Sequence, residues 1–200
     1  RSGITIDHSE DPASFSTTTL AKYRVVVFAS TTGPLLDGEQ RAAFEQWVRN
    51  GGGFIGLHSA ADTAYDWPFY GELVGAWFES HPPGLQRARV RFEAPDTEAM
   101  LGPWRVTDEL YDFRDNPRPQ VSVIAALHDR EDTGGMGDDH PIAWCHQRLG
   151  GRAWYTGLGH DPRIYADPVF RALLRGGLHY ALGMRARCDE VSSDPANMAR

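Results

Sequence analysis

The sequence predicts a single α/β domain with a mostly parallel β-sheet and helices on both faces, and three observations support this fold class. First, 200 residues with 41% hydrophobic and 24% charged side chains match one ordinary globular domain. Second, two short runs, 23–30 and 54–58, are continuously apolar, as strands buried on both faces of a parallel sheet should be. Third, a helix pattern separates these runs, and the order strand, helix, strand indicates a right-handed parallel crossover.

The elements of the first half follow from local patterns. Asp37 can cap a helix, and Gln40 can reach back as its capping-box partner. An apolar stripe follows, and the glycines after Asn50 end this helix. A proline in the first turn indicates a second, shorter helix. The predicted elements are a strand at 4–6, a strand at 23–30, a helix between Asp37 and Asn50, a strand at 54–58 and a short helix at 66–75.

The second half contains more strands. Residues 87–92 alternate between polar and apolar side chains, as a strand with one wet face should. The acidic, glycine-rich segment 129–140 matches no calcium-loop template, and we expect a mobile loop there. The predicted elements are strands at 87–92, 121–127, 141–146 and 153–157, a hairpin turn at 149–152, and a helix from Asp167 to about Leu182. We expect one domain over residues 1–187 and a polar tail over 188–200.

Charge and composition exclude several partners. The net charge is −7, Lys22 is the sole lysine and no basic stripe is present, which argues against nucleic acid binding. No apolar run approaches the roughly 18 residues that a membrane span needs. Without a visible signal peptide the cytoplasm is slightly favoured, although the chain begins at Arg1 and we expect its natural start to lie upstream. A homo-oligomer is compatible with the sequence.

The two cysteines do not make a disulfide framework. Cys145 lies in an apolar run, which predicts a buried and unreactive thiol. Cys188 lies in the polar tail, and a single bridge between the two is left open.

His58 is the first candidate functional residue, because it ends the predicted strand 54–58 and small residues follow it. Small residues at a strand end permit a sharp turn that lifts one side chain above the sheet, where ligands of open α/β sheets bind. His58 is therefore placed to act as a general acid or base, a metal ligand or a hydrogen-bond donor. The alternatives are a histidine that only bonds to nearby backbone, and a triad with Ser59 as nucleophile. Cysteine chemistry is excluded, because no cysteine is present at this turn.

Other polar residues are placed to join His58. His160 follows the predicted strand 153–157 at a glycine-flanked exit, so two histidines point to one shared crevice. Glu109 and Tyr111 would project from one face of an extended segment. His81 and Trp67 complete the set, although a tryptophan is more often part of a core than a platform for a sugar ring.

Taken together, these motifs resemble the ThuA-like (trehalose utilisation) family over roughly residues 1–185. The resemblance implies a flavodoxin-like, class I glutamine amidotransferase-like fold that lacks the amidotransferase cysteine, so that glutaminase activity is rejected. It also implies a role in carbohydrate metabolism, on a trehalose-like disaccharide or its 3-keto form. Family members usually open with a strand and a helix ahead of the segment at Ile4, and we expect these to be absent. The matching segments appear in family order at 51–62, 67–70, 81–82, 108–111, 141–144 and 158–162.

The resemblance also carries over site residues by position. These are catalytic His58, Glu109 and His160, and substrate-binding Asp62, Trp67, His81 and Tyr111.

The leading hypothesis is an enzyme that acts on a sugar or an oxidised sugar. A set of histidines, a carboxylate and a phenol without a nucleophile suits proton transfer next to a carbonyl, as in isomerisation or epimerisation. Glu109 or His160 would then be the base, and His58 would polarise the oxygen. Metal-assisted hydrolysis is a variant, since three histidines and Glu109 offer ligands for a divalent ion. No nucleotide cofactor is expected. The alternative is a non-catalytic sugar-binding or regulatory module.

Overall fold

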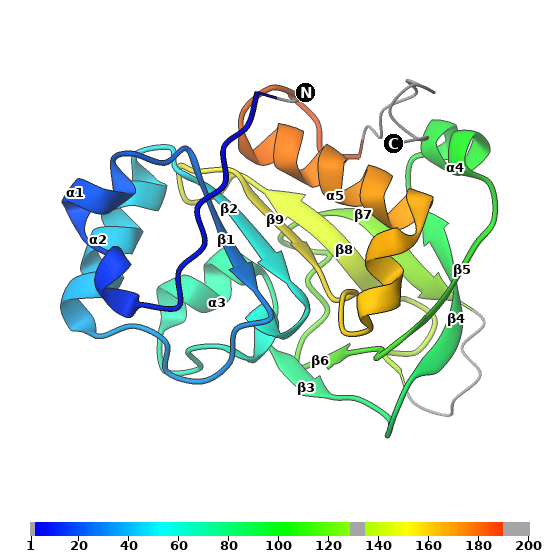
Figure 1. The fold of residues 1–200 in the computed structure, drawn as a ribbon. Helices are drawn as coiled ribbons and strands as arrows, with labels where there is room; N and C mark the ends of the chain where they lie inside the picture. Colours follow the sequence, from blue (N-terminus) through cyan, green and yellow to red (C-terminus); the bar gives the residue numbers. More distant parts are fainter. Residues whose placement is uncertain (1–2, 129–134, 190–200) are drawn as a thin grey trace.

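The computed structural model describes residues 3–128 and 135–189, and these residues form a seven-stranded mixed sheet with helices on both faces (Figure 1). Part of the predicted loop at 129–140 and most of the predicted polar tail lie outside the described residues. In spatial order the strands are β1 (Val25–Ala29), β2 (Gly53–Leu57), β9 (Ala153–Thr156), β8 (Pro141–His146), β7 (Ser122–His128), β4 (Gln86–Phe92) and β5 (Trp104–Asp108).

The remaining elements cover the sheet or connect its strands. A separate two-stranded ribbon pairs β3 with β6. The helices are α1 (Thr17–Leu20), α2 (Gly38–Arg49), α3 (Pro68–Val74), α4 (Pro95–Leu101) and α5 (Pro168–Ala181), the 3-10 turns are η1 (Pro12–Ser14), η2 (His58–Asp62) and η3 (Pro162–Ala166), and the ribbon strands are β3 (Phe78–Ser80) and β6 (Asp112–Phe113).

The prediction of a mostly parallel sheet was wrong. Among the described strands, β1–β2 and β2–β9 pair in parallel, while the four remaining pairs of the large sheet are antiparallel. The reason lies in the connections. Residues 147–152 join β8 to β9 directly, and so short a link returns the chain antiparallel, whereas a parallel neighbour needs a crossover of a dozen or more residues.

The amino-terminal part also differs from the prediction. Residues 4–6 form no strand, and Ile6 is 82% exposed. The strand predicted at 23–30 is present as β1, but it lies at the edge of the sheet, and Val27 is 47% exposed. The continuously apolar run therefore predicted the strand correctly, but its predicted burial on both faces was wrong. Whether a strand lies at the edge of a sheet depends on which other strands pair with it, and the run itself does not specify this.

The signals for α2, α3 and α5 were read correctly, whereas α1 and α4 were not predicted. The α2 helix has the predicted capping box, in which the Asp37 carboxylate accepts from the Gln40 backbone N–H at 2.9 Å and the Gln40 side chain accepts from the Asp37 N–H at 2.9 Å. Asp167 caps α5 by accepting from the backbone N–H groups of Val169 and Phe170. Both helices thus begin where short-range chemistry satisfies their first N–H groups.

Aromatic packing on β9 shows how the layers are arranged. Trp154 and Tyr155 are consecutive, so their side chains point to opposite faces of the sheet. Trp154 packs against Gly177 of α5, which crosses one face of the sheet (Figure 1). Tyr155 packs on Trp144, whose indole N–H donates to the carbonyl of Val74 at the end of α3. The core therefore has two layers, one beneath α5 and one beneath α3.

A disulfide joins Cys145 of β8 to Cys188, with 6.3 Å between the two Cα atoms. The expectation of a free, unreactive thiol at Cys145 was therefore wrong, and the bridge that the sequence left open is present. Cys188 is buried rather than part of a solvated tail. No helix among the described residues is long and apolar enough to cross a membrane.

Candidate active site

His58 stands where β2 turns into η2, as the sequence predicted. Its backbone has φ = +49°, which is uncommon for a residue with a side chain and costs of order 1–3 kcal/mol. Two bonds hold it there. Nδ1 of the ring lies 2.9 Å from the carbonyl oxygen of Gly157, just beyond β9, and the Tyr155 hydroxyl donates to the His58 carbonyl at 2.8 Å. The parallel pair β2–β9 therefore fixes both the position and the orientation of the imidazole.

Glu109 and His160 meet His58 from two other segments. The His58 Nε2 atom lies 3.1 Å from Oε2 of Glu109, which follows β5. The His160 Nδ1 atom lies 3.3 Å from the same nitrogen and 3.4 Å from the same carboxylate oxygen. The three predicted catalytic residues are thus brought together, with His58 buried, the Glu109 side chain 12% exposed and His160 open to solvent.

The hydrogen bond of His58 determines which of its nitrogens is protonated. A carbonyl oxygen only accepts, so Nδ1 carries the hydrogen that is donated to Gly157. Burial lowers the pKa of His58, and this outweighs the Gly157 bond and the nearby carboxylates of Glu109 and Asp108, which raise it. The ring is therefore neutral near pH 7, and its Nε2 lone pair faces a carboxylate oxygen. Two lone pairs at 3.1 Å repel unless a proton or a cation lies between them.

The donor set suits a divalent cation. Among the described residues, His58, Glu109 and His160 each offer one ligand atom, and these atoms lie within 4.8 Å of one another. Two imidazoles and one carboxylate form the ligand set of catalytic zinc sites and of facial-triad iron sites, both of which keep positions open for substrate. The Gly157 bond to the other nitrogen of His58 is the outer support that metal-binding histidines usually have.

The ribbon formed by β3 and β6 provides the next wall of the site. Tyr111 precedes β6, and its ring centroid lies 4.2 Å from that of His58 and 5.8 Å from that of His81. The His81 Nε2 atom lies 3.4 Å from Oε1 of Glu109, and its side chain is 32% exposed. His81 and Tyr111 are therefore beside the three central residues, as predicted, and His81 is open to a ligand.

The other two predicted binding residues lie differently. Asp62, at the end of η2, accepts a hydrogen bond of 2.6 Å from the Tyr65 hydroxyl and is half-buried. Trp67 is 7% exposed and packs on Phe44 and Tyr70 in the aromatic core. The structure does not bring Trp67 to the site, and its position is the core alternative that the sequence already suggested.

Asp108 is a residue of the site that sequence reasoning missed. Its carboxylate is fully buried and accepts from the backbone N–H groups of Gly159, Asp161 and Glu109 at 2.7, 2.8 and 3.0 Å. Burial raises the pKa of Asp108, and the three N–H groups and His58 oppose this rise. The available signal was its place directly before Glu109 in a matching motif, but no local pattern shows that its partners lie about fifty residues downstream.

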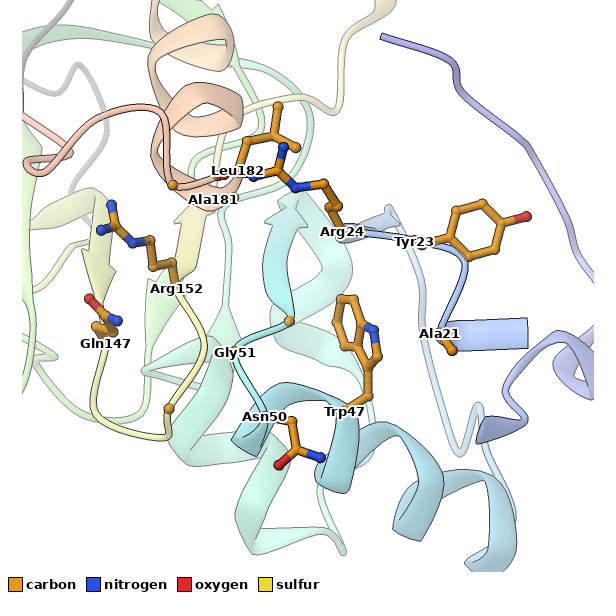
Figure 2. Close-up of a pocket in the computed structure, with 13 residues that line it drawn as sticks. Ala21, Tyr23, Arg24, Trp47, Asn50, Gly51, Gln147, Arg152, Ala181 and Leu182 are labelled. Atoms are coloured by element: carbon orange, nitrogen blue, oxygen red, sulfur yellow. Dashed lines mark hydrogen bonds between the residues drawn. The ribbon is translucent and has the colours of Figure 1, made fainter. Parts of the chain in front are cut away.

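A cavity at the opposite end of the parallel strands contains none of the predicted residues (Figure 2). It has a volume of about 410 Å³ and lies where β1, β2 and β9 begin. Arg24 and Arg152 line it, but each donates to a carbonyl beyond the end of α5, those of Leu182 and Arg185. The candidate active site therefore lies at the other end of these strands, the carboxyl end, where β2 ends at Leu57 before His58 and β9 ends at Thr156 shortly before His160.

Solved structures with the same fold support this view of the chain. A ThuA-like protein from Bacteroides uniformis is 23% identical, with 90% of this chain and 77% of that chain covered and a TM-score of 0.74. One from Parabacteroides merdae is 21% identical, with 70% and 61% covered and a TM-score of 0.60. Gan42B, a GH42 β-galactosidase from G. stearothermophilus, is 17% identical, with 80% of this chain and 22% of that enzyme covered and a TM-score of 0.52. At these identities the likeness concerns the fold.

The sequence comparison decides the family. No curated protein matches the chain. The profile of the ThuA family, described as trehalose utilisation, matches residues 1–181, which is nearly the whole chain. The chain therefore belongs to the ThuA family, with its class I glutamine amidotransferase-like α/β fold.

Proposed function

We propose that this protein is an enzyme that transfers a proton next to the carbonyl of an oxidised sugar, at a divalent-cation site formed by His58, Glu109 and His160. The observation that carries this proposal is the convergence of three ligand atoms within 4.8 Å, with the lone pair of a neutral imidazole facing a carboxylate. A bound cation would relieve that repulsion and would polarise a substrate carbonyl as a Lewis acid.

The chain also offers a group for the proton. If His58, Glu109 and His160 each give one ligand atom, neither imidazole keeps a free lone pair to act as the base, and the second oxygen of Glu109, Oε1, faces His81. His81 lies beside Glu109 and is partly exposed, so its imidazole can face a substrate that sits over the three residues. We therefore assign His81 as the group that takes the proton from carbon and returns it, in place of the base role predicted for Glu109 or His160. The Pro82 carbonyl orients the ring of His81, because it accepts from Nδ1–H at 2.9 Å and so leaves Nε2 as the basic nitrogen.

Family membership supports a sugar as the substrate. The family is described by trehalose utilisation, and the chain has no cysteine at the His58 turn. Tyr111 is 4% exposed and its ring packs against His58 and Phe78, so the groups at the site that can meet a sugar include His81 and His160. A 3-keto-disaccharide fits a site for proton transfer, because its carbonyl makes the neighbouring C–H acidic. Hydrolysis of the same substrate is the second reaction that a cation at these residues would serve.

The test combines metal analysis with isotope exchange. Purified protein is analysed for transition metals, and proton NMR follows 3-keto-trehalose and trehalose in D₂O. We expect one equivalent of metal and deuterium next to the carbonyl of the keto-sugar. Glu109→Gln and His160→Ala should lose the metal, and His81→Ala should keep it while exchange slows by about 10²–10⁴-fold.

Two exposed residues give matched controls, because Glu10→Gln and His8→Ala make the same changes far from the site in sequence. Both should leave metal content and exchange unchanged. Release of glucose would show that the reaction is hydrolysis and not proton transfer. Activity in metal-free protein would show that the reaction needs no cation. No turnover of either sugar would favour the non-catalytic binding module.

A further inference from the structure

We infer that Asp108 is a positioning residue that holds Glu109 and His160 in place around His58. The inference deepens the proposed function, on which it rests, since it explains how two residues about fifty positions apart are fixed at one site. Asp108 itself does not reach the reacting atoms. It acts through backbone N–H groups on both segments.

The contacts of the Asp108 carboxylate are distributed over both segments. Oδ2 accepts from the Gly159 N–H at 2.7 Å, and Oδ1 accepts from the Asp161 N–H at 2.8 Å. These two groups flank His160, so its backbone is held on both sides. Oδ1 also accepts from the Glu109 N–H at 3.0 Å. One side chain thereby fixes the main chain at both residues that face His58.

The sheet order explains why such a bond is needed. Glu109 follows β5, which is the edge strand furthest from β1, and three strands lie between β5 and β9. Pairing within the sheet therefore does not place Glu109 beside His160. The sheet curls until the end of β5 meets η3, and Asp108 bonds the two where they meet.

The chemistry favours a carboxylate over any other side chain of this size. Asp108 is fully buried, and an ionised carboxylate without partners would be costly there. The hydrogen bonds from three N–H groups to the two carboxylate oxygens offset the free-energy cost of burying the charge. Hydrogen bonds to a charged acceptor are also shorter and stronger than those between neutral groups. An amide in its place keeps one acceptor oxygen and turns an N–H₂ group toward a backbone donor. The three hydrogen bonds from Gly159, Asp161 and Glu109 to Asp108 are called the Asp108 clamp below. The substitution Asp108→Asn therefore disrupts this clamp while it preserves side-chain volume.

Asp167 provides a matched control for the loss of three hydrogen bonds. Its carboxylate also accepts three N–H groups, those of Val169, Phe170 and the Trp104 indole. Asp167→Asn therefore makes the same chemical change at the start of α5, where it does not touch His58, Glu109 or His160. Both variants are compared with the wild type in thermal unfolding, in Zn²⁺ affinity by competition with a chromophoric chelator, and in the absorption spectrum of the Co²⁺ form.

We expect Asp108→Asn to fold and to bind Zn²⁺ about 10–100-fold more weakly, with an altered Co²⁺ spectrum. Asp167→Asn should lose stability without any change in either metal readout. Unchanged Zn²⁺ affinity and Co²⁺ spectrum in folded Asp108→Asn would overturn the inference. If Asp108→Asn does not fold, amide exchange in the wild type decides: the N–H groups of Gly159 and Asp161 should exchange slowly, and fast exchange at both would refute the hydrogen bonds to Asp108.

A readout without metal keeps this inference separate from the proposed function. If the wild type binds no metal, the cation proposal fails by itself. Asp108 is then tested by the NMR contact between the His58 and His160 rings, whose centroids lie 5.1 Å apart. The contact should disappear in Asp108→Asn and persist in Asp167→Asn. Its persistence in both variants would show that Asp108 does not position His160.

Discussion

His58 and His146 have the same local arrangement, although only His58 belongs to the site. Each ring is buried, and each places one nitrogen against a backbone carbonyl, that of Gly157 for His58 and that of Leu73 for His146. Burial lowers the pKa of both imidazoles below the usual 6.5, against the effect of these hydrogen bonds. Both residues are therefore neutral in the folded protein under conditions in which an unfolded chain begins to bind protons.

This arrangement predicts an acid-sensitive fold. Below a pH of 6.5 the unfolded chain binds more protons at these two positions than the folded one, so stability falls as the pH drops from 6.5 toward the lowered pKa values. Above pH 6.5 both histidines are neutral in the folded and in the unfolded chain, so this loss of stability is absent there. Urea unfolding of metal-free protein, prepared with a chelator, should show a lower midpoint at pH 5 than at pH 7.5.

The variant His146→Gln separates this effect from general acid denaturation. It keeps a donor for the Leu73 carbonyl and removes one titrating group, so the difference between the two midpoints should shrink. His8→Gln alters an exposed histidine and should leave the difference as in the wild type. An equal difference in all three proteins would contradict the assignment to buried histidines.

At the scale of elements, the contact between α5 and β9 leaves no room for a side chain at Gly177. A Cβ atom there would lie 2.5 Å from Cδ2 of Trp154, whose ring is fully buried. The sequence pattern shows Gly177 as a weak point of a helix, because glycine lowers helix stability. The structure shows that it is the position at which the helix approaches the sheet.

Gly177→Ala should therefore destabilise the protein by about 1–3 kcal/mol through overpacking, despite the higher helix propensity of alanine. Gly38→Ala is the matched control, since nothing lies within 4 Å of its Cβ position in the first turn of α2. It should be neutral or stabilise by up to about 1 kcal/mol. Chemical denaturation measures both changes. A stable Gly177→Ala protein would show that Trp154 can move aside.

At the scale of the whole molecule, the Cys145–Cys188 disulfide ties the chain beyond α5 to the centre of the sheet. It closes a loop with a sequence separation of 43 and so restricts the unfolded chain. Disulfides persist in oxidising surroundings and are rare in the cytosol, so the bridge argues against the slight preference for the cytoplasm that the sequence suggested.

Reduction of this disulfide should lower the free energy of unfolding by about 2–4 kcal/mol, measured by urea unfolding with and without a reductant. A Cys145→Ala, Cys188→Ala double variant should have the reduced stability and should not respond to reductant. Two free thiols in the native protein purified without reductant would contradict the bridge.

Much of the candidate site was predictable from the sequence because it depends on local signals. His58 and His160 stand at the exits of two strands that are recognisable by their apolar runs, and Glu109 and Tyr111 lie in one short motif. The capping box of α2 and the proline start of α5 are equally local. Each of these features is fixed by residues that are neighbours along the chain.

Other features emerged only with the tertiary structure. These are the antiparallel part of the sheet, the burial of Trp67, the disulfide and the Asp108 clamp. The sequence by itself thus determined most of the strands and helices, although not β3, β5, β6, α1 or α4, and the polar residues that end several of them, because propensity and periodicity act over a few residues. The tertiary structure decided which strands pair, which side chains are buried and which carboxylate meets which N–H group, because these depend on contacts between segments far apart in the chain, which no local pattern specifies.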